Sequence, residues 1–129
     1  MNDLTLVDTD ILIDVGRSLP DAVDWVYRKH RPSELAVSAI TQMELMIGCE
    51  SLAELRKLDR FLKQFLILNV NPAITDRAIR LLRTYRLSHG LLIADGLIAA
   101  TALVLKMPLA TNNQRDFRFI KGLRVIEYP

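Results

Sequence analysis

Short apolar runs rich in β-branched residues alternate along this chain with longer segments in which apolar residues recur every three or four positions. The first pattern is typical of buried strands and the second of amphipathic helices. The run at residues 4–7, for example, gives way to helical spacing from Asp10, and Gly16 supplies a stop signal. The expected strands lie at 4–7, 35–38, 66–70, 108–111 and 123–128, and the expected helices at 10–16, 20–30, 39–48, 51–65, 72–88 and 92–106.

This alternation predicts the fold class. Strands separated by helices form right-handed βαβ units, which build a parallel sheet covered by helices on both faces. We therefore expect an α/β fold, namely a three-layer α/β/α sandwich with a central, mainly parallel sheet. A chain of 129 residues suits one such core and is too short for two, so residues 1–129 are expected to form a single domain.

Composition narrows the kind of site and its environment. One cysteine, Cys49, and two distant histidines, His30 and His89, exclude an internal disulfide and the usual Cys/His zinc spacing. Cys49 is interpreted as a small buried apolar residue. No apolar stretch reaches the roughly 20 residues that span a bilayer, and the start does not resemble a secretion signal, so we expect a cytoplasmic location without a membrane partner. The net charge of +2 implies no strong field for polyanions.

Three carboxylates occupy positions that their neighbours mark as facing inward. Asp8 ends a strand that we expect to be central and buried. Glu44 falls within an apolar stripe at helical spacing, formed by Ile40, Met43 and Ile47. Asp95 shares its helix face with small and branched apolar residues, namely Leu91, Ile98, Ala99 and Ala102. Polar groups at such positions are more informative than exposed ones.

Each acid also has a purely structural interpretation. Thr41 and Glu44 match the spacing of a capping box, and Asp95 fits the first turn of a helix, where it complements the dipole. Either Asp8 or Asp10 could be the N-cap of the helix that follows. Asp10 directly precedes the first helical apolar residues and is expected to have that role. Asp14, one turn further on, is interpreted as a solvated residue.

The structural roles do not account for the three acids together, because several unpaired charges facing a core would be very costly. Strand C-termini and helix N-termini converge on one crevice in an open α/β sheet, so a shared cation would resolve the repulsion. Carboxylates without His or Cys favour a hard ion such as Mg²⁺ or Mn²⁺. The sequence therefore predicts metal-assisted phosphate chemistry, with Asp8, Glu44 and Asp95 as ligands.

A polar loop after the fourth expected strand, "TNNQRDFRFIKGLR" at residues 111–124, adds to this prediction. It supplies Asp116 as a fourth acid for the catalytic site. Arg115 and Arg118 are placed to hold a phosphodiester backbone.

Taken together, these segments resemble the PIN-domain endoribonucleases, and in particular the VapC-type toxins of type II toxin–antitoxin pairs. The matching segments follow the family's order over essentially the whole chain; they are "LVDTDILID", "SAITQMELMIG", "LLIADGLIAATAL" and "LATNNQRDFRFIKGLRVI". The resemblance implies that Asp8, Glu44 and Asp95 bind Mg²⁺ or Mn²⁺ and that an RNA phosphodiester is hydrolysed. It also implies a homodimer and a cognate VapB-type antitoxin whose C-terminal segment fills a groove leading to the acids.

The resemblance assigns supporting roles as well, and the chain departs from the family at one position. Thr9 is expected to shape the site, and Asp10, Thr111 and Asn113 to support it. Many members carry Thr-x-Asp near the last core strand, where this chain has Asn113 as the third residue. Asp116 is the nearest replacement, and the number of metal ions stays open. Core packing is the role expected of the helix methionines Met43 and Met46.

Three other functions compete with the ribonuclease interpretation. A DNA-directed nuclease of the flap type would carry an additional arch or clamp segment, and none is visible here. A phospho-acceptor receiver domain would have an acceptor Asp after a middle strand, which the runs at 35–38 and 66–70 do not provide. A catalytically idle PIN module that binds RNA or protein stays open because of Asn113.

Overall fold

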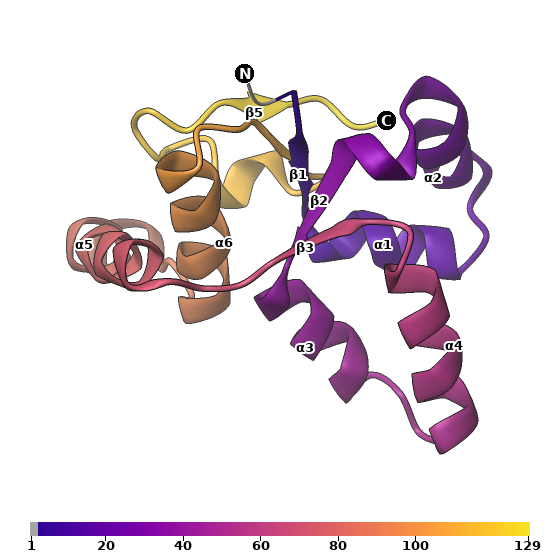
Figure 1. Cartoon of the computed structure of the whole chain (residues 1–129). Coiled ribbons are helices and arrows are strands. Elements are labelled where there is room, and N and C mark those ends of the chain that lie inside the picture. The colour runs from indigo at the N-terminus through magenta and orange to yellow at the C-terminus, as the bar shows by residue number, and fades with distance from the viewer. Residues whose placement is uncertain (1–2) are drawn as a thin grey trace.

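The structure is a computed structural model that describes residues 3–129, and it confirms the predicted α/β class (Figure 1). All neighbouring strands pair in parallel, in the order β3-β2-β1-β4-β5. The order reverses between β1 and β4, which is where α/β sheets open a crevice for ligands. The strands are β1 (Thr5–Val7), β2 (Leu35–Ser38), β3 (Leu66–Leu68), β4 (Leu109–Ala110) and β5 (Val125–Ile126).

Helices connect the strands and cover the sheet. In Figure 1, α5 and α6 lie on one side of the strands, and α1, α2 and α4 lie on the other. The α-helices are α1 (Thr9–Gly16), α2 (Pro20–Asp24), α3 (Ala39–Ile47), α4 (Leu52–Leu62), α5 (Pro72–His89) and α6 (Ile93–Val104). A π-helical turn, η1 (Trp25–Lys29), follows α2, and two 3₁₀ turns complete the described part of the chain, η2 (Pro32–Glu34) and η3 (Gln114–Asp116). None of these helices is both long and apolar enough to cross a membrane.

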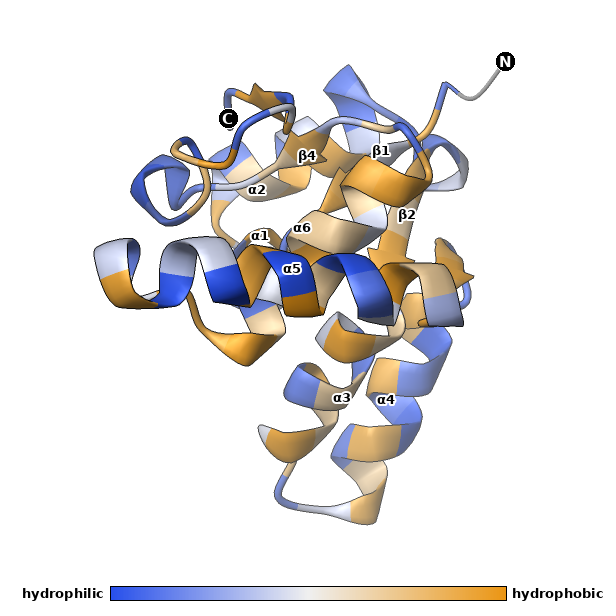
Figure 2. Cartoon of the chain, turned by 90° about the vertical axis from the view of Figure 1, so that its left-hand side faces the viewer, coloured by the Kyte–Doolittle hydropathy of each residue, from blue (hydrophilic) through white to orange (hydrophobic). Residues whose placement is uncertain are grey.

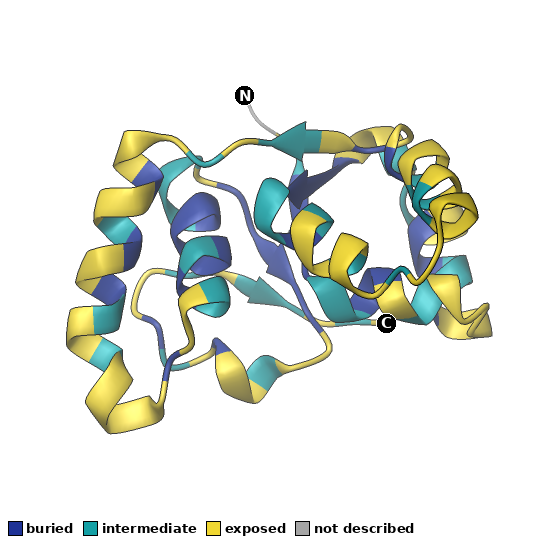
Figure 3. Cartoon of the chain, turned by 90° about the horizontal axis from the view of Figure 1, so that it is seen from below, coloured by how far each residue is buried: buried dark blue, intermediate teal, exposed yellow. Residues whose placement is uncertain are grey.

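The three inner strands, β1, β2 and β4, are buried on both of their faces, as expected for a parallel sheet under helices, whereas the edge strands β3 and β5 are only partly buried. Side chains alternate between the two faces, so consecutive strand residues enter different cores. Leu6, Ala36 and Leu109 pack in the core under α5 and α6, whereas Val7, Val37 and Ala110 pack in the core under α1, η1 and α4. Figure 3 shows the matching division in α5, which is buried toward α6 and exposed on its outer side.

Local signals fix several helix ends where the sequence predicts them. Asn71 caps α5, since its side chain accepts a hydrogen bond from the Ile74 N–H at 2.8 Å, and Pro72 follows at the first helical position. Gly90 ends the same helix at φ 71°, in the left-handed conformation that glycine adopts without strain. These contacts set where α5 stops and where the turn into α6 begins.

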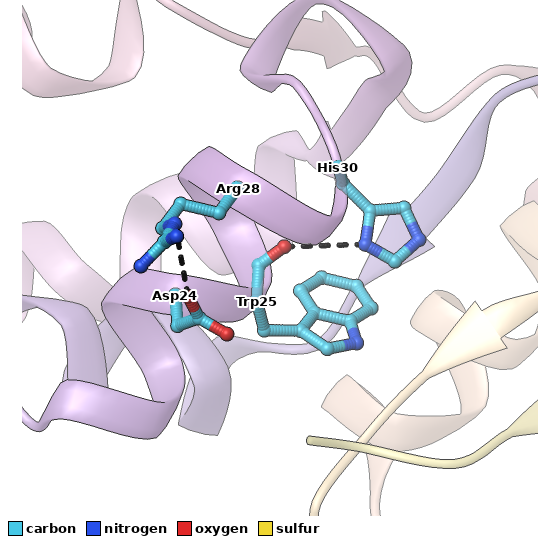
Figure 4. A network of polar contacts seen from close by, with 4 residues as sticks. All are labelled: Asp24, Trp25, Arg28 and His30. Carbon is cyan, nitrogen blue, oxygen red and sulfur yellow. Dashed lines mark hydrogen bonds and ion pairs between the residues drawn. The ribbon is translucent and has the colours of Figure 1, made fainter.

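The helix predicted over residues 20–30 changes its winding halfway. In η1 the His30 N–H bonds to the Trp25 carbonyl, which is the five-residue step of a π-helix, and the His30 ring packs on Trp25 at 4.1 Å between centroids. Figure 4 shows the Trp25 carbonyl in contact with the His30 ring as well, beside the ion pair of Asp24 and Arg28. Trp25 also meets the ring of Tyr128, so this turn anchors the end of the chain.

The prediction for the buried face of α3 is wrong. Met43, Met46 and Ile47 are 50%, 42% and 85% exposed, whereas Thr41 is fully buried. Figure 2 shows apolar segments, in orange, along α3, where it projects with α4 from the body of the molecule. An apolar stripe at helical spacing does not reveal whether the surface it covers belongs to the same chain. Core packing is therefore not the role of the two methionines within this chain.

Cys49 also differs from its predicted environment. It is half-buried, and its Sγ donates a weak 3.5 Å contact to the Leu45 carbonyl at the end of α3.

Candidate metal centre

Asp8 lies at the C-terminal end of β1, in the middle of the sheet and beside the crevice. Its side chain is 5% exposed. Oδ1 accepts a 2.8 Å hydrogen bond from the Thr9 N–H, and Oδ2 accepts one of 2.8 Å from the Thr111 hydroxyl. Burial raises the pKa of this carboxyl, the two hydrogen bonds lower it, and repulsion from Glu44 raises it further. Asp8 thus lies buried at the end of a central strand, as predicted. Its two hydrogen bonds hold it in one orientation, in a place where its charge is costly.

The Thr111 hydroxyl is itself positioned by the loop that follows β4. It accepts a 2.9 Å hydrogen bond from the Asn113 N–H while it donates to Asp8. Gln114 fastens the same loop, because its side-chain amide donates to the carbonyls of Thr111 and Ile126. Asn113 therefore acts through its backbone here, and its exposed side chain is separate from this relay.

Glu44 reaches the site from α3, although its predicted inward position is wrong. Its side chain is exposed, and Oε1 accepts a 2.7 Å hydrogen bond from the Thr9 hydroxyl. The same Thr9 oxygen lies 2.9 Å from the hydroxyl of buried Thr41. A hydroxyl has one proton, so when Thr9 donates to Glu44 the Thr41 hydroxyl must donate to Thr9. The capping box is absent too, because Ser38 is the N-cap of α3.

Asp10 does not cap α1, contrary to the prediction. Asp8 is the N-cap, and Asp10 lies in the first turn, where its Oδ2 accepts a 3.2 Å hydrogen bond from the Asn112 N–H. Its Oδ1 is buried and has no hydrogen-bond partner. Burial and the charge of Asp8 raise the pKa of Asp10 to about 7. Buried carboxylate oxygens normally have a hydrogen-bond donor, and one that lacks a donor is typical of a site for a cation. Oδ1 of Asp10, which lies beside Asp8, is such an oxygen.

Asp14, at the far end of α1, is not fully solvated. It is half-buried and accepts a 3.3 Å hydrogen bond from the Tyr128 hydroxyl. Burial, together with the charge of Asp14 and this hydrogen bond, raises the pKa of Tyr128 to about 12. Asp14 therefore fixes the C-terminal segment against α1, apart from the site.

Asp95 stands in the first turn of α6, with Ile98, Ala99 and Ala102 buried on its face as predicted. Its pKa is raised to about 6, first by burial and then by repulsion from Asp8, Asp116 and Glu44. Four acids from β1, α3, α6 and the η3 turn thus share one electrostatic environment.

Asp116 and Arg115 border this environment from η3, while Arg118 is placed apart from it. Asp95, Arg115 and Asp116 line one pocket of about 310 Å³. Arg118 is exposed and is not among the residues that line this pocket. Of the two predicted phosphate-binding arginines, the structure brings only Arg115 next to the acids.

The side chains present suit a hard divalent cation by their chemistry. Carboxylate oxygens are the donors that Mg²⁺ and Mn²⁺ prefer, and the acids repel one another. Within residues 3–129, however, no three Asp, Glu, His or Cys side chains lie together in an arrangement that would hold an ion as they stand.

Sequence reasoning missed two residues that support the site. Thr41 was considered only as a capping residue, and its signal was a hydroxyl at a buried helix position. Gln114 had no signal of its own, because only the fold brings the carbonyls of Thr111 and Ile126 together around it.

Comparison with known protein families gives one match over most of the chain. The family described as "PIN domain" matches residues 5–123. Ribonuclease VapC10 of Mycobacterium tuberculosis is 36% identical over 122 residues, which cover 94% of this chain and 91% of that protein. Ribonuclease VapC19 of the same organism is 34% identical over 123 residues, covering 94% and 98%.

Solved structures give the same likeness. A chain in a toxin–antitoxin complex from Klebsiella pneumoniae is 32% identical, with a TM-score of 0.77 and 95% of each chain covered. A chain in VapBC2 of Rickettsia felis, bound to a DNA fragment from its promoter, is 26% identical with a TM-score of 0.77, covering 98% of this chain and 99% of that one.

Proposed function

Because the chain belongs to the PIN-domain family, we propose that it is a Mg²⁺- or Mn²⁺-dependent endoribonuclease and the toxin of a toxin–antitoxin pair. The similar proteins VapC10 and VapC19 are named ribonucleases, and the similar solved chains are in toxin–antitoxin complexes. The observation that carries the proposal is the gathering of acids at one end of the sheet. Thr9 donates hydrogen bonds to both Asp8 and Glu44, and the buried Oδ1 of Asp10 beside them has no hydrogen-bond partner.

In this proposal Asp8, Glu44 and Asp95 hold the ion, which when bound polarises a phosphoryl oxygen and lowers the pKa of a water. The protein's own contribution is orientation. Thr111 holds Asp8, and Thr9 holds Glu44. Arg115, on the rim of the pocket, binds a phosphate of the RNA, while Asp116 plays a lesser part because it is exposed on the short η3 turn.

The antitoxin would bind the groove between α1, η1 and α4. This groove has a volume of about 550 Å³ and an apolar floor that includes Leu12, Val15, Leu58 and Phe61. Its rim carries both signs of charge, with Glu54 and Lys57. An amphipathic segment fits such a groove by placing its apolar face inward.

A second copy of the chain would cover the exposed apolar residues of α3. Met43, Met46 and Ile47 form an unpaired stripe on the structure, and aromatic or Met-rich stripes of this kind are enriched at interfaces. Light scattering on the purified protein tests the homodimer, and Ile47→Glu should shift it toward monomer.

The nuclease proposal is tested with protein purified free of antitoxin and incubated with a mixed RNA pool and a matched single-stranded DNA. We expect RNA cleavage with Mg²⁺ or Mn²⁺ and none after chelation with EDTA or in Asp8→Asn. Intact RNA in every metal condition would support an idle binding module instead. Cleavage of the DNA alone would support a DNA-directed nuclease.

A further inference from the structure

One side of the pocket beside Asp95 is lined by residues that have no role in the proposed hydrolysis. The acids and Arg115 form one side of it, and the end of α5 and the loop after η3 form the other, with His89 and Phe119. Its volume of about 310 Å³ lies at the small end of the range of roughly 300–1,000 Å³ for small-ligand sites. In Figure 1 the ends of α5 and α6 that border this pocket lie close together.

His89 and Phe119 form an aromatic platform. Their rings stack at 4.2 Å between centroids with an interplanar angle of 11°. Tyr85, one turn before His89 on α5, meets both rings edge-on, at 5.9 Å from His89 and 5.2 Å from Phe119. His89 is exposed and Phe119 is half-buried, so the histidine forms the outer layer of the stack.

Polar contacts hold this platform in place. The Lys121 N–H donates a 3.1 Å hydrogen bond to the Tyr85 hydroxyl, which ties the supporting ring to the loop. The Ser88 hydroxyl lies 2.7 Å from Nδ1 of His89. The Arg86 guanidinium holds the turn into α6 by donating to the carbonyls of Gly90 and Leu91. A platform fixed before its ligand arrives loses little freedom on binding.

We propose that this platform is a nucleobase subsite, where one unpaired base of the RNA stacks next to the phosphate that is cleaved. This inference rests on the proposed function. Bases of single-stranded RNA stack on aromatic side chains, including His and Phe, and any base offers a flat face. Asp95 and Asp116 line the same pocket and would repel an anion, whereas a base is neutral.

The arrangement also determines how the strand lies. Arg115 is the cation that lines this pocket, and it binds the phosphate attached to the stacked nucleotide. With the base on His89 and a neighbouring phosphate at Asp95, only an unstacked strand fits, because a paired base in an A-form helix does not present its face. The subsite therefore selects single-stranded RNA.

The experiment measures binding and cleavage separately. Binding of a fluorescent single-stranded RNA that contains the mapped cleavage site is followed by anisotropy in the Asp8→Asn background. His89→Ala and Phe119→Ala should each weaken binding by about 5- to 150-fold, which corresponds to the roughly 1–3 kcal/mol of one stacked base. His89→Phe should retain binding, since it keeps the flat face. Leu87→Ala is the matched control, because Leu87 is on the same turn of α5 and is 99% exposed.

Cleavage then identifies the base. An abasic nucleotide placed on one side of the scissile phosphate should slow cleavage by the wild type as much as His89→Ala slows cleavage of intact RNA. The two changes together should slow cleavage no more than either change alone. Equal binding by wild type and His89→Ala would overturn the subsite. So would losses in cleavage rate from His89→Ala and the abasic nucleotide that add fully, whichever side of the scissile phosphate carries the abasic nucleotide. If the wild type cleaves no RNA, the proposed function fails instead, and the two failures are thus distinguishable.

Discussion

The Thr111 hydroxyl donates a 2.8 Å hydrogen bond to Asp8, and the two residues are separated by 103 positions along the chain. The bond joins the ends of β1 and β4, where the strand order reverses. It holds the carboxylate in place, and it opposes the rise in pKa that burial causes.

Thr111→Val should therefore reduce cleavage and weaken Mn²⁺ binding by about 10- to 100-fold, the usual effect of losing a partner that orients a metal ligand. Titration calorimetry and RNA cleavage measure the two effects. Thr101→Val is the matched control, since Thr101 is also buried but bonds within α6 to the Leu97 carbonyl. Equal losses in the two variants would point to general destabilisation.

Thr9 and Thr41 form a second relay, which ends at Glu44. Thr41→Val removes the hydroxyl that donates to the Thr9 oxygen, so Thr9 loses a contact that holds its side chain toward Glu44. We expect a drop in cleavage of about tenfold with the fold retained. Thr41→Ser keeps the hydroxyl and should restore most of the rate. If both variants behave alike, the relay through Thr9 is not what orients Glu44.

Asp95 and Asp116 should differ in importance, although they line one pocket. Asp95→Asn removes a half-buried acid on α6 and should lower cleavage at least 100-fold, whereas Asp116→Asn should lower it less than tenfold. The same cleavage assay ranks the two variants. If Asp116→Asn lowers cleavage as much as Asp95→Asn does, then Asp116 replaces the acid that other family members carry at the position of Asn113.

The raised pKa values of Asp10 and Asp95 predict how stability depends on pH. In the folded chain these groups titrate at about 7 and about 6, compared with 3.8 ordinarily, so the folded state holds protons that the unfolded chain releases. Their contribution to stability is therefore lost as pH rises from about 4 through the folded values. Without metal we expect Tm to fall by about 5 °C between about pH 5 and pH 8.

Asp10→Asn should flatten this fall, while Asp76→Asn, at an exposed position of α5, should not. Mn²⁺ should raise Tm most at high pH, because it binds the charged acids. Thermal unfolding by circular dichroism checks both expectations. A melting temperature that rises across this range in wild type would contradict the assigned pKa directions.

The sequence predicted the features that depend on local periodicity. Asp8 was identified because it follows a strand, and Asp95 because it shares a face with small apolar residues; both are where those patterns place them. Asn71 caps the start of α5 and Gly90 its end, as predicted, because capping depends on the residues adjacent to each helix end.

The errors have physical causes. Glu44 was assigned to the wrong face because apolar residues on α3 cover a surface that this chain leaves open. Asp10 was the predicted N-cap of α1, but Asp8 is the observed one. The sequence does not separate them because both lie next to the first N–H groups of the helix. The stack of His89 on Phe119 joins a helix end to a loop without periodicity, so no sequence pattern could reveal it.

The position of β4 beside β1 has a consequence for the order of events during synthesis. Translation proceeds from the N-terminus, so Asp8, Glu44 and Asp95 leave the ribosome before Thr111 and the η3 turn do. Until β4 inserts at the middle of the sheet, the Asp8 side chain has no Thr111 to orient it. The nascent chain therefore exposes Asp8, Glu44 and Asp95 before the contact that orients Asp8 can form.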